Sequence, residues 1–122
     1  MKDTRSTEPV RIIFDTDMGS DCDDAGALAV LHKLADKGEV EILGVIYSSA
    51  FCLYGAGACD AINTYYGRGD LPLGQNHGAD VGQDDSAFTR QIATDRATYG
   101  HRVIDDAPDM MATYASILRE QP

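Results

Sequence analysis

Apolar and polar positions alternate along this chain in a pattern that predicts strands and helices in turn. Apolar, β-branched runs at residues 10–14 and 40–49 predict buried strands, and a shorter run at 71–75 predicts a third. Residues 23–38 and 55–70, which lie between these runs, carry apolar side chains at helical spacing. Because strand, helix and strand follow one another within about forty residues, the pattern indicates βαβ units and a parallel sheet.

The second half of the chain is less regular. Residues 75–85 are rich in Gly, Asp and Asn and predict a loop, whereas 88–99 predict a polar helix. Residues 105–122 predict a longer helix with Pro108 in its first turn. Its expected apolar face consists of Met111, Tyr114, Ile117 and Leu118. The predicted fold class is α/β, a Rossmann-like, mostly parallel sheet flanked by helices.

Both ends of the chain influence the interpretation. Residues 1–9 are polar and end in Pro9, which predicts a disordered tail. The chain stops directly after a predicted helix, with only about three strands formed, although an α/β chain normally returns to a strand. We therefore expect 10–122 to be the N-terminal portion of a longer domain. An unfinished sheet edge would favour a homo-oligomer or aggregation.

Composition excludes several classes of function. Hydrophobic residues make up 43% of the 122 residues, which excludes a disordered chain. The formal net charge of −10 argues against nucleic acid and against anionic membrane surfaces, because both require clustered Lys and Arg. No run approaches the ~20 apolar residues of a membrane span, and no signal peptide is visible, so we expect a cytoplasmic location. The three cysteines form no CxxC motif and are expected to be half-buried.

The chemistry of the sequence is concentrated in "DTDMGSDCDDA", which begins at Asp15 and leads into the first predicted helix. Five aspartates lie between Asp15 and Asp24, and so many neighbouring carboxylates repel one another unless a cation lies among them. Ca²⁺ prefers such oxygen ligands. The alternative is that these aspartates cap the helix and form turns, but capping requires one Asp rather than five.

Two known metal-site templates fit this loop poorly. The EF-hand pattern fails because Gly19 occupies its fifth position and Gly26 its twelfth. The haloacid-dehalogenase phosphatases resemble the loop more closely, since an apolar strand ends in DxD. Such a Mg²⁺ phosphatase would use Asp15 as nucleophile and Asp17 as acid/base. However, that family's pattern requires Thr or Val where this chain has Gly19, and it gives no role to the following "DCDDA".

A third template fits best: "DTDMGSDCDDAGAL" resembles the N-terminal signature of the nucleoside hydrolases. "EILGVIYSS", "DAINTYYGRGDLPLG" and "DDAPDMMATYASILREQP" extend the resemblance over nearly the whole chain, which matches only the N-terminal part of that family's domain. The resemblance implies Ca²⁺-dependent hydrolysis of the N-glycosidic bond of a ribonucleoside. It also implies that Asp17 and Asp24 bind Ca²⁺, that Asp17 acts as general base, that Asp23 binds a ribose hydroxyl, and that Asp15 shapes the loop.

The chain departs from the family's pattern at several positions. Extra residues lie between Gly19 and the Asp pair, so Asp21 replaces Asp23 as sugar ligand if the loop is aligned from its other end. Ser48 and Ser49 stand where the family usually has Asn. The family's remaining Ca²⁺ ligands would lie beyond Pro122. We therefore expect this chain alone to bind Ca²⁺ weakly without turnover, and a non-catalytic remnant that binds Ca²⁺ or a riboside is the third reading.

The three histidines do not form a catalytic pattern. His32 is expected to be a surface or packing residue within the first helix. His77 lies in the Gly/Asn-rich loop, where it can contact a substrate, and His101 is expected to be solvated. No Ser/His/Asp or Cys/His triad is apparent.

Overall fold

The computed structural model describes residues 8–19, 21–50, 52–78 and 87–121 and contains a parallel sheet. Its strands are β1 (Val10–Thr16), β2 (Val40–Tyr47) and β3 (Leu73–Gln75), in the order β1-β2-β3. The predicted α/β class with a parallel sheet is therefore confirmed. Most of the predicted tail, residues 1–7, and most of the predicted loop, residues 79–86, lie outside the described residues.

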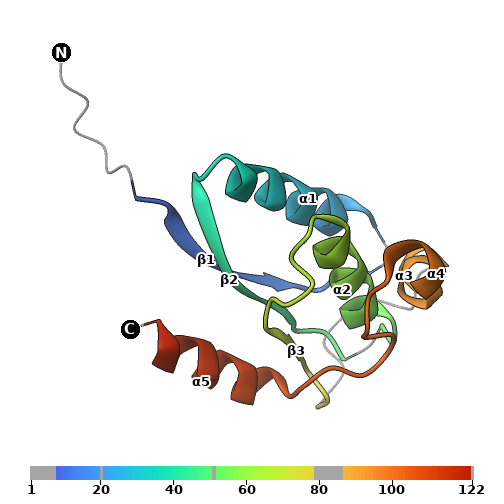
Figure 1. Ribbon diagram of the computed structural model, residues 1–122. Helices are drawn as coiled ribbons and strands as arrows, with labels where there is room; N and C mark the ends of the chain where they lie inside the picture. The colour runs from blue at the N-terminus through green and yellow to red at the C-terminus, as the bar shows by residue number, and fades with distance from the viewer. Residues whose placement is uncertain (1–7, 20, 51, 79–86, 122) are drawn as a thin grey trace.

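Five helices accompany the sheet in the described part of the chain. They are α1 (Asp23–Asp36), α2 (Gly55–Tyr65), α3 (Ala87–Thr94), α4 (Arg96–Tyr99) and α5 (Met110–Glu120). Helices α1 and α2 lie on one side of the sheet and α5 lies on the other, so the molecule has three layers (Figure 1). Helices α3 and α4 pack against α2.

The main core lies between the sheet and the layer formed by α1 and α2. Leu28 on α1 and Val45 on β2 are fully buried there, as is Tyr47. On the other face, Gly44 of β2 allows Ile117 of α5 to approach closely, because a Cβ at position 44 would overlap that side chain. Gly57 serves the same purpose in α2, where a Cβ would overlap the backbone carbonyl oxygen of Ile104.

Two of the helix predictions require correction. The single helix predicted for 88–99 is divided at Asp95, whose side chain accepts a hydrogen bond from the Thr98 amide and begins a new helix. The predicted first turn at Pro108 lies outside α5, because Asp109 caps the helix through the Ala112 amide at 2.9 Å.

The predicted apolar face of α5 is also partly wrong. Met111 and Leu118 are 66% and 58% exposed, whereas Thr113 and Ile117 are buried against the sheet. The close approach at Gly44 rotates the helix so that Ile117 faces β2. A stripe of exposed apolar side chains therefore remains along the outside of α5.

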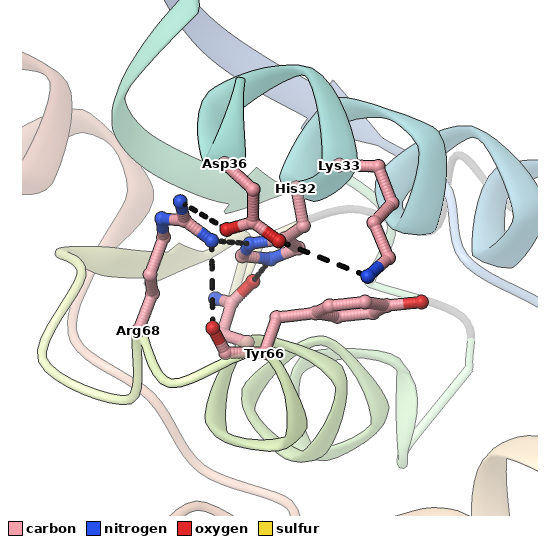
Figure 2. A network of polar contacts seen from close by, with 6 residues as sticks. His32, Lys33, Asp36, Tyr66 and Arg68 are labelled. Atoms are coloured by element: carbon pink, nitrogen blue, oxygen red, sulfur yellow. Dashed lines mark hydrogen bonds and ion pairs between the residues drawn. The ribbon is translucent and has the colours of Figure 1, made fainter. Parts of the chain in front are cut away.

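Helix α1 is fixed to α2 by a polar network around His32 (Figure 2). The fully buried ring is stacked on Tyr66 and lies 2.8 Å, through Nε2, from Oδ1 of Asn63. Arg68 places its guanidinium 3.3 Å from Nδ1 and forms an ion pair with Asp36 at 2.8 Å. Because a guanidinium only donates, Nδ1 must accept and Nε2 must carry the proton, so the imidazole is neutral.

The expectations for four further residues were wrong. His101 is 4% exposed rather than solvated, and its Nε2 donates to the carbonyl oxygen of Ala93 at 2.7 Å. Of the three cysteines expected to be half-buried, Cys22 is exposed whereas Cys52 and Cys59 are buried. The cause is local: Cys22 precedes α1 in the acidic loop, and the other two face the core around α2.

Candidate functional site

The carboxyl ends of the three strands are tied together at one edge of the sheet. The Ser48 amide, after β2, donates to the carbonyl oxygen of Thr16 at 2.9 Å. The Asn76 side chain, after β3, donates to the carbonyl oxygen of Ser48 at 2.9 Å. Residues that follow different strands therefore lie side by side, and ligands of open α/β sheets bind at this type of edge.

Asp24 is the most firmly placed carboxylate of the acidic loop. It lies in the first turn of α1, where the helix dipole favours a negative charge. The hydroxyl of Thr16 donates to its Oδ2 at 2.5 Å, and the same hydroxyl accepts from the Met18 amide at 3.0 Å. Because Thr16 is buried and Asp24 half-buried, this contact fixes the start of the helix to the end of the strand.

Asp17 lies beside Asp24. Their carboxyl groups are within hydrogen-bonding reach, and this contact, followed by burial and by the like charge of Asp24, raises the pKa of Asp17. Two neighbouring carboxylates repel one another, and a cation bound between them would remove this repulsion. The structure thus brings together the two residues predicted to bind metal.

Asp21 and Asp23 form a second, exposed pair. A side-chain hydrogen bond with Asp23, followed by the like charge of that residue, raises the pKa of Asp21. The two residues predicted as alternative sugar ligands therefore lie together, and either of them can present a carboxylate at the start of α1.

Asp15 is separate from both pairs. Its Oδ2 accepts a hydrogen bond from the hydroxyl of Tyr114 on α5, on the opposite side of the sheet from α1. Burial, followed by this contact, raises the pKa of Tyr114 to about 12, so its hydroxyl remains a donor at neutral pH. Asp15 is thus held by α5 and is placed apart from the Asp17–Asp24 pair.

The donor chemistry of the loop fits a hard divalent cation, but the number of donors is small. Asp17 and Asp24 supply carboxylate oxygens, which Ca²⁺ prefers, yet Ca²⁺ takes 6–8 oxygen ligands. No group of three or more His, Cys, Asp or Glu side chains able to hold a metal occurs among the described residues. The described residues therefore do not by themselves make up a Ca²⁺ coordination shell.

A separate groove of about 520 Å³ lies away from these carboxylates. It is formed by α1, α2, α3 and α4 and is lined mainly by small and aromatic side chains, among them Gly26, Tyr65 and Tyr66. None of the five aspartates of the loop lines this groove. It is therefore distinct from the candidate site.

Three residues of this region were missed by the sequence interpretation. Thr16 orients Asp24, Asn76 connects the ends of β2 and β3, and Tyr114 holds Asp15. The position of Thr16 between two aspartates at the end of a strand was a local signal for its role. No local signal pointed to Tyr114, because it lies 99 residues from its partner.

Comparisons of the chain with protein-family models, with curated proteins and with solved structures found no match. In the part of the chain that the structure describes, no helix has the length and apolar character required to cross a membrane.

Proposed function

We propose that this chain carries the divalent-cation half of an N-ribosyl hydrolase site, which cleaves the N-glycosidic bond of a ribonucleoside with Ca²⁺ as cofactor. The observation that supports this proposal best is the pairing of Asp17 with Asp24 at the carboxyl end of β1. Capping of α1 does not explain this pair, because the N-cap residue of that helix is Cys22, whose side chain makes no capping hydrogen bond. The resemblance of "DTDMGSDCDDAGAL" to the nucleoside hydrolase signature supports the same reaction.

In this proposal Asp17 and Asp24 hold the ion. The chemistry expected of a bound Ca²⁺ is to acidify and orient a water molecule beside the sugar. With the ion bound, Asp17 would take up the proton of that water as general base. Thr16 keeps Asp24 in place through the 2.5 Å hydrogen bond, so that one oxygen of the pair is fixed before the substrate arrives.

The remaining carboxylates favour the transition state. Hydrolysis of a glycosidic bond passes through an oxocarbenium-like state, in which positive charge develops on the sugar ring. Asp23 accepts a hydrogen bond from a ribose hydroxyl, and Asp21 lies within reach for the same role. The surrounding negative charge stabilises the developing cation.

Calcium titration tests the metal site directly. We expect isothermal titration calorimetry to give weak binding, with a dissociation constant on the order of 10⁻⁴–10⁻³ M, because the described loop pairs only two ligands. Asp17→Asn and Asp24→Asn should each weaken binding at least about tenfold, since even the outer partners of metal ligands are worth that much. Asp105→Asn, which removes an exposed carboxylate outside the loop, is the matched control and should leave binding unchanged.

Product assays test the proposal against its two alternatives. Release of base from inosine or uridine that depends on Ca²⁺ and on Asp17 would establish the hydrolase. Calcium binding without release is expected both of this chain alone and of a binding protein, so it does not separate these two. A phosphatase would lose all activity in Asp15→Asn, while the hydrolase would depend more strongly on Asp17 and Asp24. Calcium affinity that is unaffected by either Asn substitution would eliminate the proposed site.

A further inference from the structure

His32 connects α1 to the C-terminal end of α2 through both ring nitrogens and one face of its ring (Figure 2). Nε2 lies 2.8 Å from Oδ1 of Asn63, and Nδ1 lies 3.3 Å from the guanidinium of Arg68. The ring is stacked on Tyr66, with 5.0 Å between the two ring centroids. Because His32 is fully buried, its protonation state has to be compatible with all three neighbours at once.

Arg68 is held beside this imidazole by contacts of its own. Its backbone amide donates to the carbonyl oxygen of Asn63 at 2.8 Å, directly after a turn at Gly67, whose φ is +80°. The guanidinium also donates to the carboxylate of Asp36 on α1 at 2.8 Å. Since a guanidinium has donors and no acceptor, it can contact Nδ1 only while that nitrogen carries no proton.

The charged groups around His32 come from α1 and from the segment after α2. On α1, the charge of Asp36 acts on the imidazole, and Lys33 lies 3.9 Å from the same carboxylate. Arg68 brings a second positive charge, whereas Asn63 contributes an uncharged amide. Burial, and then the charge of Arg68, lower the pKa of His32, while the contact with Asn63 and the charge of Asp36 raise it.

Protonation of the imidazole would change which of these contacts are possible. A protonated Nδ1 becomes a donor, so it would face the donors of Arg68 and repel their positive charge. Asp36 follows His32 by four residues on α1, and side chains at this spacing are neighbours on one face of a helix. The charged ring would therefore compete with Arg68 for the Asp36 carboxylate.

We propose that the contact between His32 and Arg68 is a pH-dependent switch that connects α1 to the end of α2. At neutral pH the unprotonated Nδ1 accepts from Arg68, and the connection is closed. In acid a proton from solvent binds to Nδ1, Arg68 moves away, and the ring pairs with Asp36 within α1. The connection then opens while the rest of the fold persists. The inference is independent of the proposed function.

Nuclear magnetic resonance of the imidazole tests this switch, with EDTA present so that metal binding has no influence. At about pH 7.5, the nitrogen shifts of the ring should show a protonated Nε2 and an unprotonated Nδ1. On titration with acid, His32 should take up its proton below the usual pKa of 6.5. The guanidinium signals of Arg68 should change with the same midpoint, because Arg68 leaves the ring as the proton binds.

Substitution of the two charged neighbours should move this midpoint in opposite directions. Arg68→Gln removes the repelling charge and should raise the pKa of His32, whereas Asp36→Asn removes the attracting carboxylate and should lower it. Each should change the proton dissociation constant about threefold or more. Arg102→Gln is the matched control, because its ion pair with Asp70 lies outside this network, and it should leave the midpoint unchanged.

Native-state hydrogen exchange shows whether the connection opens separately from the rest of the fold. The Arg68 amide should open up to about tenfold more often for each pH unit of acidification, after correction for the intrinsic exchange rate. In His32→Gln, which cannot titrate, the opening frequency should not depend on pH. The amide of Val45, a fully buried residue of β2, should remain better protected than that of Arg68 at every pH.

Four results would overturn the switch. A proton on Nδ1 at about pH 7.5 excludes the contact with Arg68. An unchanged midpoint in Arg68→Gln excludes the repulsion, and an Arg68 amide that opens only together with Val45 excludes a separate opening. A chain that unfolds before His32 titrates excludes the open state. A lack of calcium binding or of hydrolysis would count against the proposed function and leave the switch unaffected.

Discussion

At the residue scale, the aspartates of the loop differ through their partners rather than through their chemistry. Asp24 is fixed by Thr16, Asp17 is paired with Asp24, and Asp15 is held by Tyr114 from the opposite face of the sheet. Each partner comes from a different part of the chain. Identical side chains within ten residues therefore have different roles, because the fold gives each a different environment.

At the same scale, His32 allows the pH dependence of the stability of the fold to be tested. Burial, as the largest cause, lowers the pKa of His32 below 6.5, so the unfolded chain binds a proton more readily than the folded chain. The contribution of neutral His32 to the free energy of unfolding is therefore complete above about pH 6.5, and it is lost as the pH falls toward the pKa that His32 has in the folded chain. His32 can change the free energy of unfolding by at most about 1.4 kcal/mol for each pH unit.

Urea denaturation at about pH 7.5 and pH 5.5 measures this slope. His32→Gln keeps an N–H donor for Asn63 but cannot titrate, so its stability should depend less on pH than that of the wild type. His77→Gln, which removes an exposed imidazole outside this network, is the matched control for the loss of one histidine. An unchanged slope in His32→Gln would show that this imidazole does not control acid sensitivity.

At the element scale, small residues determine how closely the helices approach their neighbours. Helix α2 contains "GAGACDA", which is buried along its length from Gly55 to Ala61. Its Asp60 carboxylate accepts hydrogen bonds from the amides of Arg102 and Val103 at 2.9 and 2.8 Å. These contacts hold the segment that leads to α5 against α2, and they require close packing at Gly57.

A pair of glycine substitutions tests this packing. Gly57→Ala should lower the free energy of unfolding by about 1–3 kcal/mol, because the added Cβ overlaps the rigid backbone oxygen of Ile104. Gly26→Ala lies on an exposed face of α1 with no atom within 4 Å of the new Cβ, and should stabilise by up to about 1 kcal/mol. Chemical denaturation of both variants measures the contrast. If both substitutions changed the free energy of unfolding equally, helix propensity alone would account for them and the close packing at Gly57 would not matter.

At the scale of the whole molecule, the net charge of −10 opposes compaction. Four of these charges lie in two carboxylate pairs, Asp17–Asp24 and Asp21–Asp23, at one end of the sheet. Salt screens repulsion of this kind throughout the molecule, whereas a bound cation relieves it at one place. The two effects are separable by experiment.

Thermal unfolding in different salts distinguishes a calcium site from general screening. CaCl₂ should raise Tm more than NaCl of the same ionic strength, because an ion that binds only the folded chain stabilises it by mass action. Asp24→Asn should lose this additional increase and keep the response to NaCl. The same Tm in both salts for the wild-type chain would indicate screening alone.

Much of the fold was predictable from local patterns. The two longer strands and the first two helices were recognised from apolar periodicity. Gly38 and Gly67, both with positive φ, directly follow the C-caps of α1 and α2. The division at Asp95 was missed because a single capping side chain outweighed a weak helical pattern. The buried state of His101 was missed because its ring is held by the carbonyl oxygen of Ala93 on α3, a partner that no pattern around residue 101 indicates.

The sequence by itself determined the parallel α/β arrangement and the concentration of aspartates after the first strand, because both depend on residue types at short spacing. Only the tertiary structure decided which aspartates pair, which residue fixes each of them and which face of α5 stays exposed. These features depend on contacts such as Tyr114 with Asp15 and Ile117 with the space above Gly44. Their partners lie far apart in the chain and meet only when the helices pack on the sheet.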